Sequence, residues 1–230
     1  MTFRTDVFLH DLFGYDLAGA ALVTLWISVT SMAVGSAIGL TLSLMQQSRF
    51  RVLRYLAWTY LWLFRGTPVL LQIIFAFNVL PSFGLILSGP ACAVVALGLH
   101  EAAYLAEIFR SGLGAVPPGQ RDAARALGMS EWRVMRLVVL PQALRIVIPP
   151  VGNQFIGLLK LSALISVIGV RELLLAAEQS ASATFRYLEA LSAAAVYYLA
   201  FTTVLMALQH VLERRFGRSD RLAAGIAADG

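Results

Sequence analysis

Two long stretches of this chain contain no charged side chain. The first runs from Leu17 to Met45, which is 29 residues, and the second runs from Gly66 to Leu99, which is 34 residues. A helix of about 20 apolar residues is enough to cross the hydrocarbon core of a bilayer. Only 13% of the residues are charged, whereas ordinary globular domains have about 25%. A membrane is therefore the expected solvent, and the predicted fold class is an all-α integral membrane protein.

Five helical spans fit the hydropathy, each long enough at about 1.5 Å of rise per residue. They are Leu17–Met45, Leu56–Pro81, Pro90–Phe109, Ile146–Ile168 and Ala190–Val211. Three acidic residues and a single Arg4 precede the first span, whereas a secretory leader begins with a positive region. We therefore expect the first span to be retained. The expected organisation is an outer segment (1–16), a transmembrane domain (17–211) and a C-terminal tail (212–230).

The distribution of arginine predicts the orientation. One side of the membrane receives the loop between spans one and two, the loop between spans three and four, and the C-terminal tail. Thirteen of the 18 basic residues lie there: Arg49, Arg51, Arg54, Arg110, Arg121, Arg125, Arg133, Arg136, Arg145, Arg214, Arg215, Arg218 and Arg221. The other side has only Arg4, Arg171 and Arg186. Because basic residues favour cytoplasmic loops, the N-terminus is expected outside and the C-terminus in the cytoplasm.

The sequence shows little catalytic or metal-binding chemistry. His10, His100 and His210 are too scattered to form a metal site. No G-x-x-x-x-G-K-[ST] phosphate loop is present, so we expect no catalytic residue, no metal and no cofactor in this chain. Cys92 is the single cysteine and is interpreted as a small residue in an apolar helix. The basic pI reflects arginines beside the spans, so no nucleic-acid partner is expected.

The loop between spans three and four, residues 110–145, is the longest polar segment, and we call it the coupling loop. Pro117, Pro118 and Gly119 interrupt the preceding helix. A short alanine-rich helix is predicted over Gln120–Leu127, ended by Gly128 in a left-handed conformation. A second helix is predicted from Glu131 to Leu140, with Ser130 as its cap. One interpretation is a docking surface for a partner protein, and the other is an amphipathic helix lying on lipid headgroups.

The loop resembles the "EAA" signature of the permease subunits of ATP-binding-cassette (ABC) importers. The matching residues are Asp122, Ala123, Ala124, Gly128, Val138, Leu140 and Pro141. Further motifs are similar to the polar amino acid permease group: R-G-T-P at 65–68, A-Y-x-A-E at 103–107, G-Q at 119–120, L-P-Q-A at 140–143 and L-L-K at 158–160. Together these motifs cover the chain from about Arg51 to Glu213. Two departures are Asp122 in place of Glu, and Leu161-Ser162-Ala163 where the group commonly has D-T-S.

The resemblance implies a MetI-like ABC importer permease fold and a function as the membrane subunit of a binding-protein-dependent importer. It implies a multi-pass protein of a bacterial inner membrane that moves polar or charged amino acids. Separate ATPase subunits would bind ATP and Mg, a second permease copy or a related permease would complete the path, and an extracytoplasmic solute-binding protein would deliver the amino acid. The expected ATPase-coupling residues are Gln120, Asp122, Ala123, Ala124, Gly128, Leu140 and Pro141.

Ionisable residues within spans point to a substrate path, because each costs about 2.5 to 3.5 kcal/mol at a helix centre. Glu101 is the deepest acid, and we expect it to receive the ammonium or guanidinium group of an amino acid, with Lys160 or Arg65 near the carboxylate. The alternative is an internal ion pair between Glu101 and Lys160. The departure after Lys160 leaves its role open. The complete set of expected path residues is Arg65, Glu101, Tyr104, Asn153, Lys160 and Ser162.

Two other classes of protein remain as alternatives. A self-sufficient, proton-coupled secondary transporter would use Glu101 and Glu107 as a proton relay. The chain shows no inverted repeat of the kind that such transporters have. A membrane-bound enzyme is disfavoured because the sequence shows no nucleophile paired with a base.

Overall fold

The computed structural model describes residues 3–228, with side chains through Arg215. All regular elements in this part of the chain are helices. In chain order they are α1 (Thr5–Phe13), α2 (Tyr15–Gln46), α3 (Arg51–Gly66), α4 (Val69–Asn78), η1 (Leu80–Phe83), α5 (Gly89–Gly114), α6 (Pro118–Ala126), α7 (Glu131–Arg133), η2 (Val134–Val139), α8 (Leu140–Leu161), η3 (Ser162–Ile168), α9 (Leu173–Thr184) and α10 (Tyr187–Ala228). The predicted all-α fold is confirmed.

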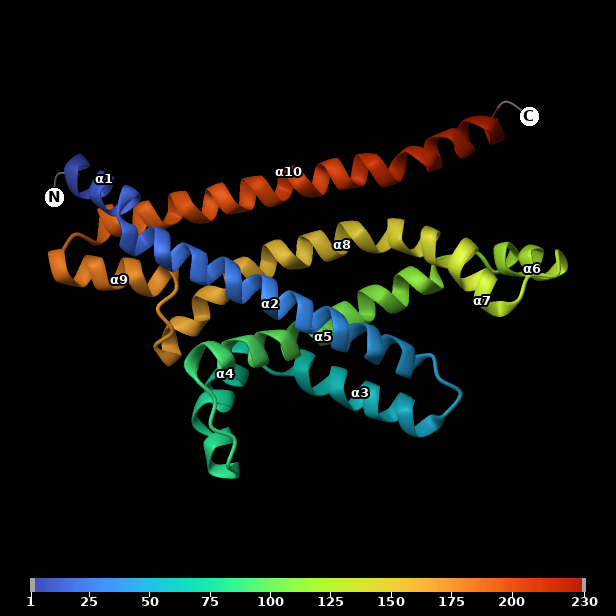
Figure 1. The fold of residues 1–230 in the computed structure, drawn as a ribbon, viewed down its shortest axis with the longest axis horizontal. Coiled ribbons are helices and arrows are strands. Elements are labelled where there is room, and N and C mark those ends of the chain that lie inside the picture. Colours follow the sequence, from blue (N-terminus) through green and yellow to red (C-terminus); the bar gives the residue numbers. More distant parts are fainter. Residues whose placement is uncertain (1–2, 229–230) are drawn as a thin grey trace.

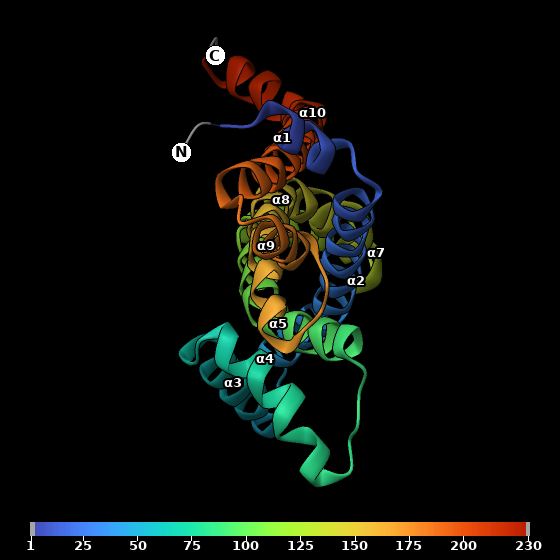
Figure 2. The same ribbon diagram turned by 90° about the vertical axis from the view of Figure 1, so that its left-hand side faces the viewer.

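The long helices α2, α5, α8 and α10 run along the long axis of the molecule (Figure 1). Viewed from one end, α1 and α10 lie at one edge of the bundle and α3 and α4 at the opposite edge (Figure 2). The contact between α2 and α5 is the most extensive in the fold. Gly35 and Gly39 make it possible, because a Cβ atom at Gly35 would lie 2.8 Å from the Cβ atom of Glu101. The G-x-x-x-G face therefore brings two helices close together.

Within the described residues, four helices are long and apolar enough to cross a membrane, or five if a bent pair counts as one span. The four are Tyr15–Gln46, Gly89–Gly114, Glu131–Ile168 and Tyr187–Arg215. This finding agrees with about five predicted spans. The predicted tail (212–230) continues α10 as far as Ala228. Residues 229–230 and the side chains of Arg218 and Arg221 lie outside the described residues.

The predicted second span, Leu56–Pro81, is wrong as a continuous helix. It consists of α3 and α4, which meet at an angle of 101°. The cause is Pro68, which has no N–H group and disfavours the helical conformation of the residue before it. Thr67 accordingly has extended backbone angles, with φ −117° and ψ 145°. The pair forms an elbow beside α5, and we call it the α3–α4 elbow.

The predicted end of the second loop helix at Pro141 is also wrong. A π-helical segment, η2, joins α7 to α8 without a break. Pro141 cannot donate a backbone hydrogen bond, and the side-chain Nε2 of Gln142 donates to the carbonyl oxygen of Val138 at 2.9 Å. The predicted cap is partly wrong as well, because Ser130 makes no side-chain capping bond and only its carbonyl oxygen accepts from Val134. The coupling loop is thus continuous with span four.

Two helices lie where the sequence predicted only connecting segments. The N-terminal segment (1–16) contains α1, which packs on α10 and α2, and the link between the last two spans contains α9. Glu172 caps α9, because its carboxylate accepts from the backbone N–H groups of Leu174 and Leu175 at 2.8 Å. The hydroxyl of Tyr198 on α10 donates to the same carboxylate at 3.1 Å. These contacts close one end of the bundle.

Candidate functional site

Glu101 is a fully buried acid in the centre of the fold. It lies on α5, its exposed fraction is 0%, and the backbone of Gly35 on α2 packs against it. Gln154 on α8 lies beside the side chain, but neither carboxylate oxygen has a hydrogen-bond partner of good geometry. Buried polar groups are almost always paired. An unpaired carboxylate between three spans is therefore the group in this fold that most needs an explanation.

The predicted alternative of a pair between Glu101 and Lys160 is not found. No ion pair joins these two residues in the described part of the chain. The side chain of Lys160 is exposed on α8, whereas Ser162 is buried and its hydroxyl donates to the carbonyl oxygen of Leu159. Asn153 is exposed on α8 and accepts a 3.2 Å hydrogen bond from Gln209 on α10. These path residues therefore do not form one cluster with Glu101.

Arg65 and Tyr104 do lie together, at the end of α3. The guanidinium carbon of Arg65 is 5.6 Å from the centre of the Tyr104 ring, which is a cation–π contact. His100, one turn earlier on α5, contacts the Tyr104 ring and has its Nδ1 atom 3.2 Å from Oε1 of Gln72. Glu107 is the next polar position on this face of α5. The face therefore presents a row of polar groups to the α3–α4 elbow.

Two guanidinium groups lie near the single carboxylate of Glu107. Nε and Nη2 of Arg110 each donate to its carboxylate at 3.1 Å, and Nε2 of Gln46 donates at 3.1 Å. Nη1 of Arg65 is farther away, at 3.7 Å. One carboxylate therefore lies between two guanidinium groups, and Arg65 is the more loosely held of the two. This three-residue group carries a net positive charge.

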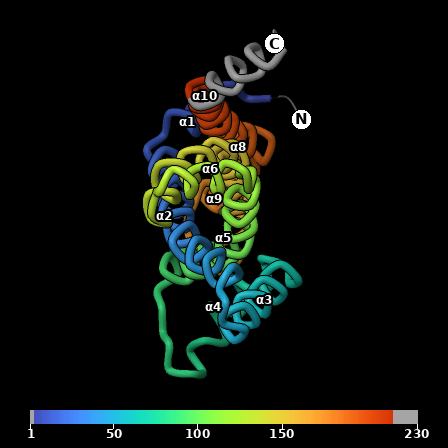
Figure 3. The backbone as a smooth tube through the Cα atoms, turned by 90° about the vertical axis from the view of Figure 1, so that its right-hand side faces the viewer, coloured from blue at the N-terminus to red at the C-terminus, as the bar shows by residue number. Residues whose placement is uncertain are grey.

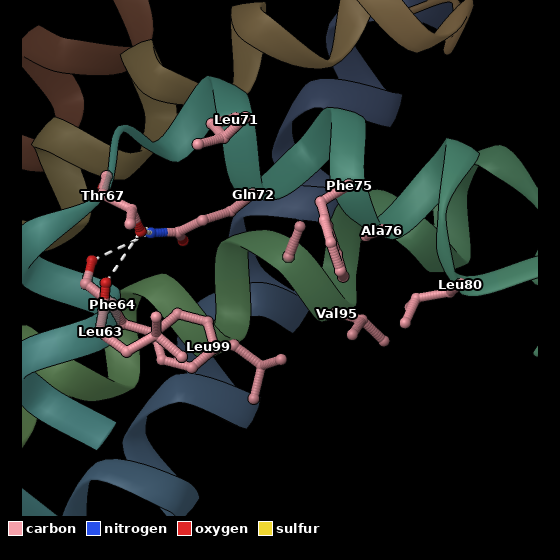
Figure 4. Close-up of a pocket in the computed structure, with 11 residues that line it drawn as sticks. Leu63, Phe64, Thr67, Leu71, Gln72, Phe75, Ala76, Leu80, Val95 and Leu99 are labelled. Atoms are coloured by element: carbon pink, nitrogen blue, oxygen red, sulfur yellow. Dashed lines mark hydrogen bonds between the residues drawn. The ribbon is translucent and has the colours of Figure 1, made fainter. Parts of the chain in front are cut away.

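Three carbonyl groups at the helix break are hydrogen-bonded to side chains. Discontinuous membrane helices often use such groups to bind ions. Here Nε2 of Gln72 donates to the carbonyl oxygens of Phe64 and Thr67 and to the Thr67 hydroxyl (Figure 4). The Thr67 hydroxyl in turn donates to the carbonyl oxygen of Leu63. The cavity of about 330 Å³ beside this bend is lined almost entirely by apolar side chains, so it suits hydrocarbon better than a polar amino acid.

The coupling loop folds into a compact seat at one end of the bundle, where α6 lies beside the start of α8 (Figures 1 and 3). Ala124 faces inward and belongs to a small apolar cluster with Val134, Val139 and Ala143. Gln120, Asp122 and Ala123 are exposed on the surface of α6. Leu140 and Pro141 begin α8 beneath them. The seven predicted coupling residues thus lie on α6, on the turn after it, and at the start of α8.

Gly128 has the predicted left-handed conformation, with φ +76°. Its N–H donates to the carbonyl oxygen of Arg125, and the N–H of Met129 donates to that of Ala124. This pair of bonds is the Schellman motif, which ends a helix and satisfies its last carbonyl groups. Met129 also packs against the apolar cluster that contains Ala124. The turn therefore fixes the direction in which the chain leaves α6.

Charges connect the two halves of the seat. Arg125 donates to both oxygens of Glu131, at 2.7 and 3.2 Å, and to Asp122 at 3.1 Å. The hydrogen bonds from Arg125 lower the pKa of Glu131 below its ordinary value. This contact is therefore present above the ordinary pKa of Glu131 and is lost as the pH falls through the lowered value. Asp122 is exposed, so it remains accessible to a partner.

Two apolar residues of the loop were missed by the sequence analysis. Leu127 is 83% exposed and Trp132 is 69% exposed, and both flank the Gly128 turn. Two such large, exposed apolar side chains so close in the sequence are candidates for contact with a partner. The signal was present as two apolar residues inside an otherwise polar segment. Gln72 and Gln154 were also missed, although each is a polar residue within an apolar stretch.

Helices that can span a membrane and an exposed polar seat at one end of the bundle are the features of a membrane permease. A family model described as "Binding-protein-dependent transport system inner membrane component" matches residues 35–218. The chain belongs to this family of inner-membrane permeases. It is therefore the permease of a binding-protein-dependent amino acid importer, as its relatives also indicate.

Two curated relatives and one solved structure are similar along most of the chain. The arginine transport system permease protein ArgU of Corynebacterium glutamicum is 40% identical over 92% of this chain and 71% of its own length. The glutamine transport system permease protein GlnP of Escherichia coli is 39% identical over 86% of this chain and 92% of its own. A crystal structure of an amino acid ABC transporter with histidines has a TM-score of 0.86 and 35% identity, covering 94% of this chain and all of that one. These similarities confirm the predicted family and fold.

Proposed function

We propose that this permease imports cationic amino acids and that Glu101 receives their positively charged end. The observation that carries the proposal is the fully buried carboxylate of Glu101, which has no ion-pair partner among the described residues and no hydrogen bond of good geometry. Intramembrane carboxylates are costly and are retained where they bind ions, protons or substrates. An ammonium or guanidinium group would supply both the missing charge and the missing hydrogen bonds. The arginine system of ArgU supports the proposal, and the glutamine system of GlnP shows that the family also includes a relative for a neutral amino acid.

The proposed complex contains two permeases and two ATPase subunits. The α8–α10 face exposes Asn153, Lys160 and His210 on helices of membrane-spanning length. Such groups are unfavourable in contact with lipid and usually face a partner or an aqueous path. We propose that this face lines the path opposite a second permease copy or a related permease. The coupling loop would seat an ATPase subunit, and that subunit would bind ATP and Mg.

Uptake by the reconstituted complex tests this function. Proteoliposomes containing the permease, its ATPase and its solute-binding protein should take up arginine only when ATP is present on the ATPase side. Lysine should compete with arginine, whereas glutamine should not. A proton uncoupler should leave uptake unchanged. Uptake that continues without ATP and stops with the uncoupler would instead favour the proton-coupled secondary transporter, and competition by glutamine would contradict the cationic specificity.

The proposed orientation places the N-terminus outside and the coupling loop in the cytoplasm. The arginine distribution supports it. A cysteine at Asp6 should react with a membrane-impermeant maleimide in intact cells, and a cysteine at Ser130 should react only after the cells are opened. Cys92 is buried, so it should contribute little background. Labelling at Ser130 in sealed cells would reverse the orientation. A cysteine at Ser219 should likewise react only after the cells are opened; the side chain of Ser219 lies outside the described residues.

A further inference from the structure

A cavity of about 480 Å³ lies beside Arg65, near the end of α3. It is lined by Trp58, Leu61, Trp62, Arg65, Gly66 and Tyr104. Arg65 is 44% exposed at its side chain. The other walls are mostly aromatic, and Arg65 is the one charged group among these six lining residues. The cavity therefore combines a single positive charge with apolar walls.

The two arginines near Glu107 have only one carboxylate between them, so the site has one positive charge in excess. Arg65 and Arg110 share the single carboxylate of Glu107, and Arg110 has the two shorter contacts. Arg65 thus retains most of its capacity to donate hydrogen bonds. A guanidinium group binds a carboxylate through two parallel hydrogen bonds. A free carboxylate is therefore the group that would complete this site.

Gly66 gives a second, independent indication. Its φ is not in the left-handed region, and a Cβ atom there would have no neighbour within 4 Å. Neither backbone conformation nor packing within this chain requires glycine at this position. A larger side chain, however, would project into the cavity beside Arg65. The lack of a side chain at Gly66 therefore keeps the space open.

We infer that this cavity is a subsite for the α-carboxylate of the transported amino acid, held by Arg65 and kept open by Gly66. The inference rests on the proposed function, in which Glu101 receives the cationic end. Tyr104, which lies under the guanidinium of Arg65, is three residues from Glu101, or about 4.5 Å along the axis of α5. Arg65, and not Lys160, is then the partner of the carboxylate.

The test compares arginine with agmatine, which is arginine without its carboxylate. Binding of each is measured by calorimetry on the purified permease–ATPase complex in phosphatidylcholine nanodiscs. Wild type should bind arginine at least about tenfold more tightly than agmatine, the size expected for a charged hydrogen-bonded contact. Gly66→Leu and Arg65→Gln should remove this difference and leave agmatine binding unchanged. Gly19→Leu is the matched control, because Gly19 on α2 also has no neighbour within 4 Å of a Cβ atom.

Each other outcome overturns a specific claim. Equal binding of arginine and agmatine by wild type would reject the carboxylate subsite and leave the role of Glu101 intact. An equal loss of both ligands in Gly66→Leu would show that the variant only distorts the fold. Competition between added phosphatidylglycerol and arginine would assign the cavity to a lipid phosphate. Unchanged agmatine binding in Glu101→Gln would reject the proposed function itself, because agmatine reports on the cationic end alone.

Discussion

Replacing Gly128 with valine should reduce ATP-driven transport at least about tenfold while leaving membrane insertion intact. The φ of Gly128 is +76°, a conformation that costs an ordinary L-residue about 1–2 kcal/mol, and more for a β-branched one. A cost of about 1.4 kcal/mol corresponds to a factor of ten in an equilibrium constant. With valine at this position, the chain would therefore leave this turn and lose the Schellman hydrogen bonds that end α6. No neighbour lies within 4 Å of a Cβ atom at this position. The effect must therefore come from the backbone and not from a steric clash.

Gly128→Asn is the matched control, because asparagine tolerates the left-handed conformation better than other non-glycine residues. Asparagine also adds a side chain at this exposed position, yet the Gly128→Asn variant should retain most of the activity. The measurements are co-purification of the ATPase subunit, ATP turnover and uptake in the same vesicles. Insertion should survive in both variants, because membrane spans satisfy their backbone hydrogen bonds within each helix. Wild-type co-purification and uptake in Gly128→Val would mean that this turn is not part of the docking element.

Sequence patterns predicted the membrane class and most of the spans because both depend on local hydropathy. The same argument failed at Pro68, since hydropathy over Leu56–Pro81 is continuous and does not report the angle between α3 and α4. The restriction that proline places on Thr67 was readable from the sequence. The size of the bend was not, because it depends on how Gln72 hydrogen-bonds to the end of α3.

The coupling loop was predictable to the extent that its signals are local. Gly128 in its left-handed turn is such a signal, and the structure confirms it. The continuation of η2 into α8 was not predictable from Pro141 alone. Proline is tolerated near the start of a helix, and the side chain of Gln142 satisfies a carbonyl group in the turn before it. Local rules therefore identified the turn but not the connection that follows it.

The path residues show the same limit. The sequence identified Glu101 as an acid deep within a predicted span, because the depth of a residue in a span follows from its position in the sequence. Whether Lys160 pairs with it depends on the rotation of α8, which hydropathy does not fix. The structure leaves Lys160 exposed and Glu101 enclosed, so the two residues are separate features. Arg65 and Tyr104 come together because α3 packs against α5, which hydropathy does not predict.

Glu101→Gln should weaken binding of arginine about 30-fold or more, because removing one partner of a close, buried charge pair costs about 2 kcal/mol or more. Without substrate, the same change should leave the melting temperature unchanged or raise it. The buried carboxylate has no ion-pair partner among the described residues and no hydrogen bond of good geometry, and a neutral amide costs less to bury than a charge without an opposite charge beside it. The amide can also hydrogen-bond with Gln154. Affinity and stability should therefore move in opposite directions.

Lower arginine affinity together with an unchanged or higher melting temperature would distinguish a substrate-binding acid from a structural one. Glu178→Gln is the matched control, since Glu178 is an exposed carboxylate on α9 and its neutralisation should change neither property. The measurements are arginine affinity by calorimetry and thermal unfolding of the purified complex with and without arginine. A structural acid would give a lower melting temperature in Glu101→Gln and unchanged arginine affinity in the molecules that remain folded. That result would remove Glu101 from the path and, with it, the physical basis for a cationic substrate.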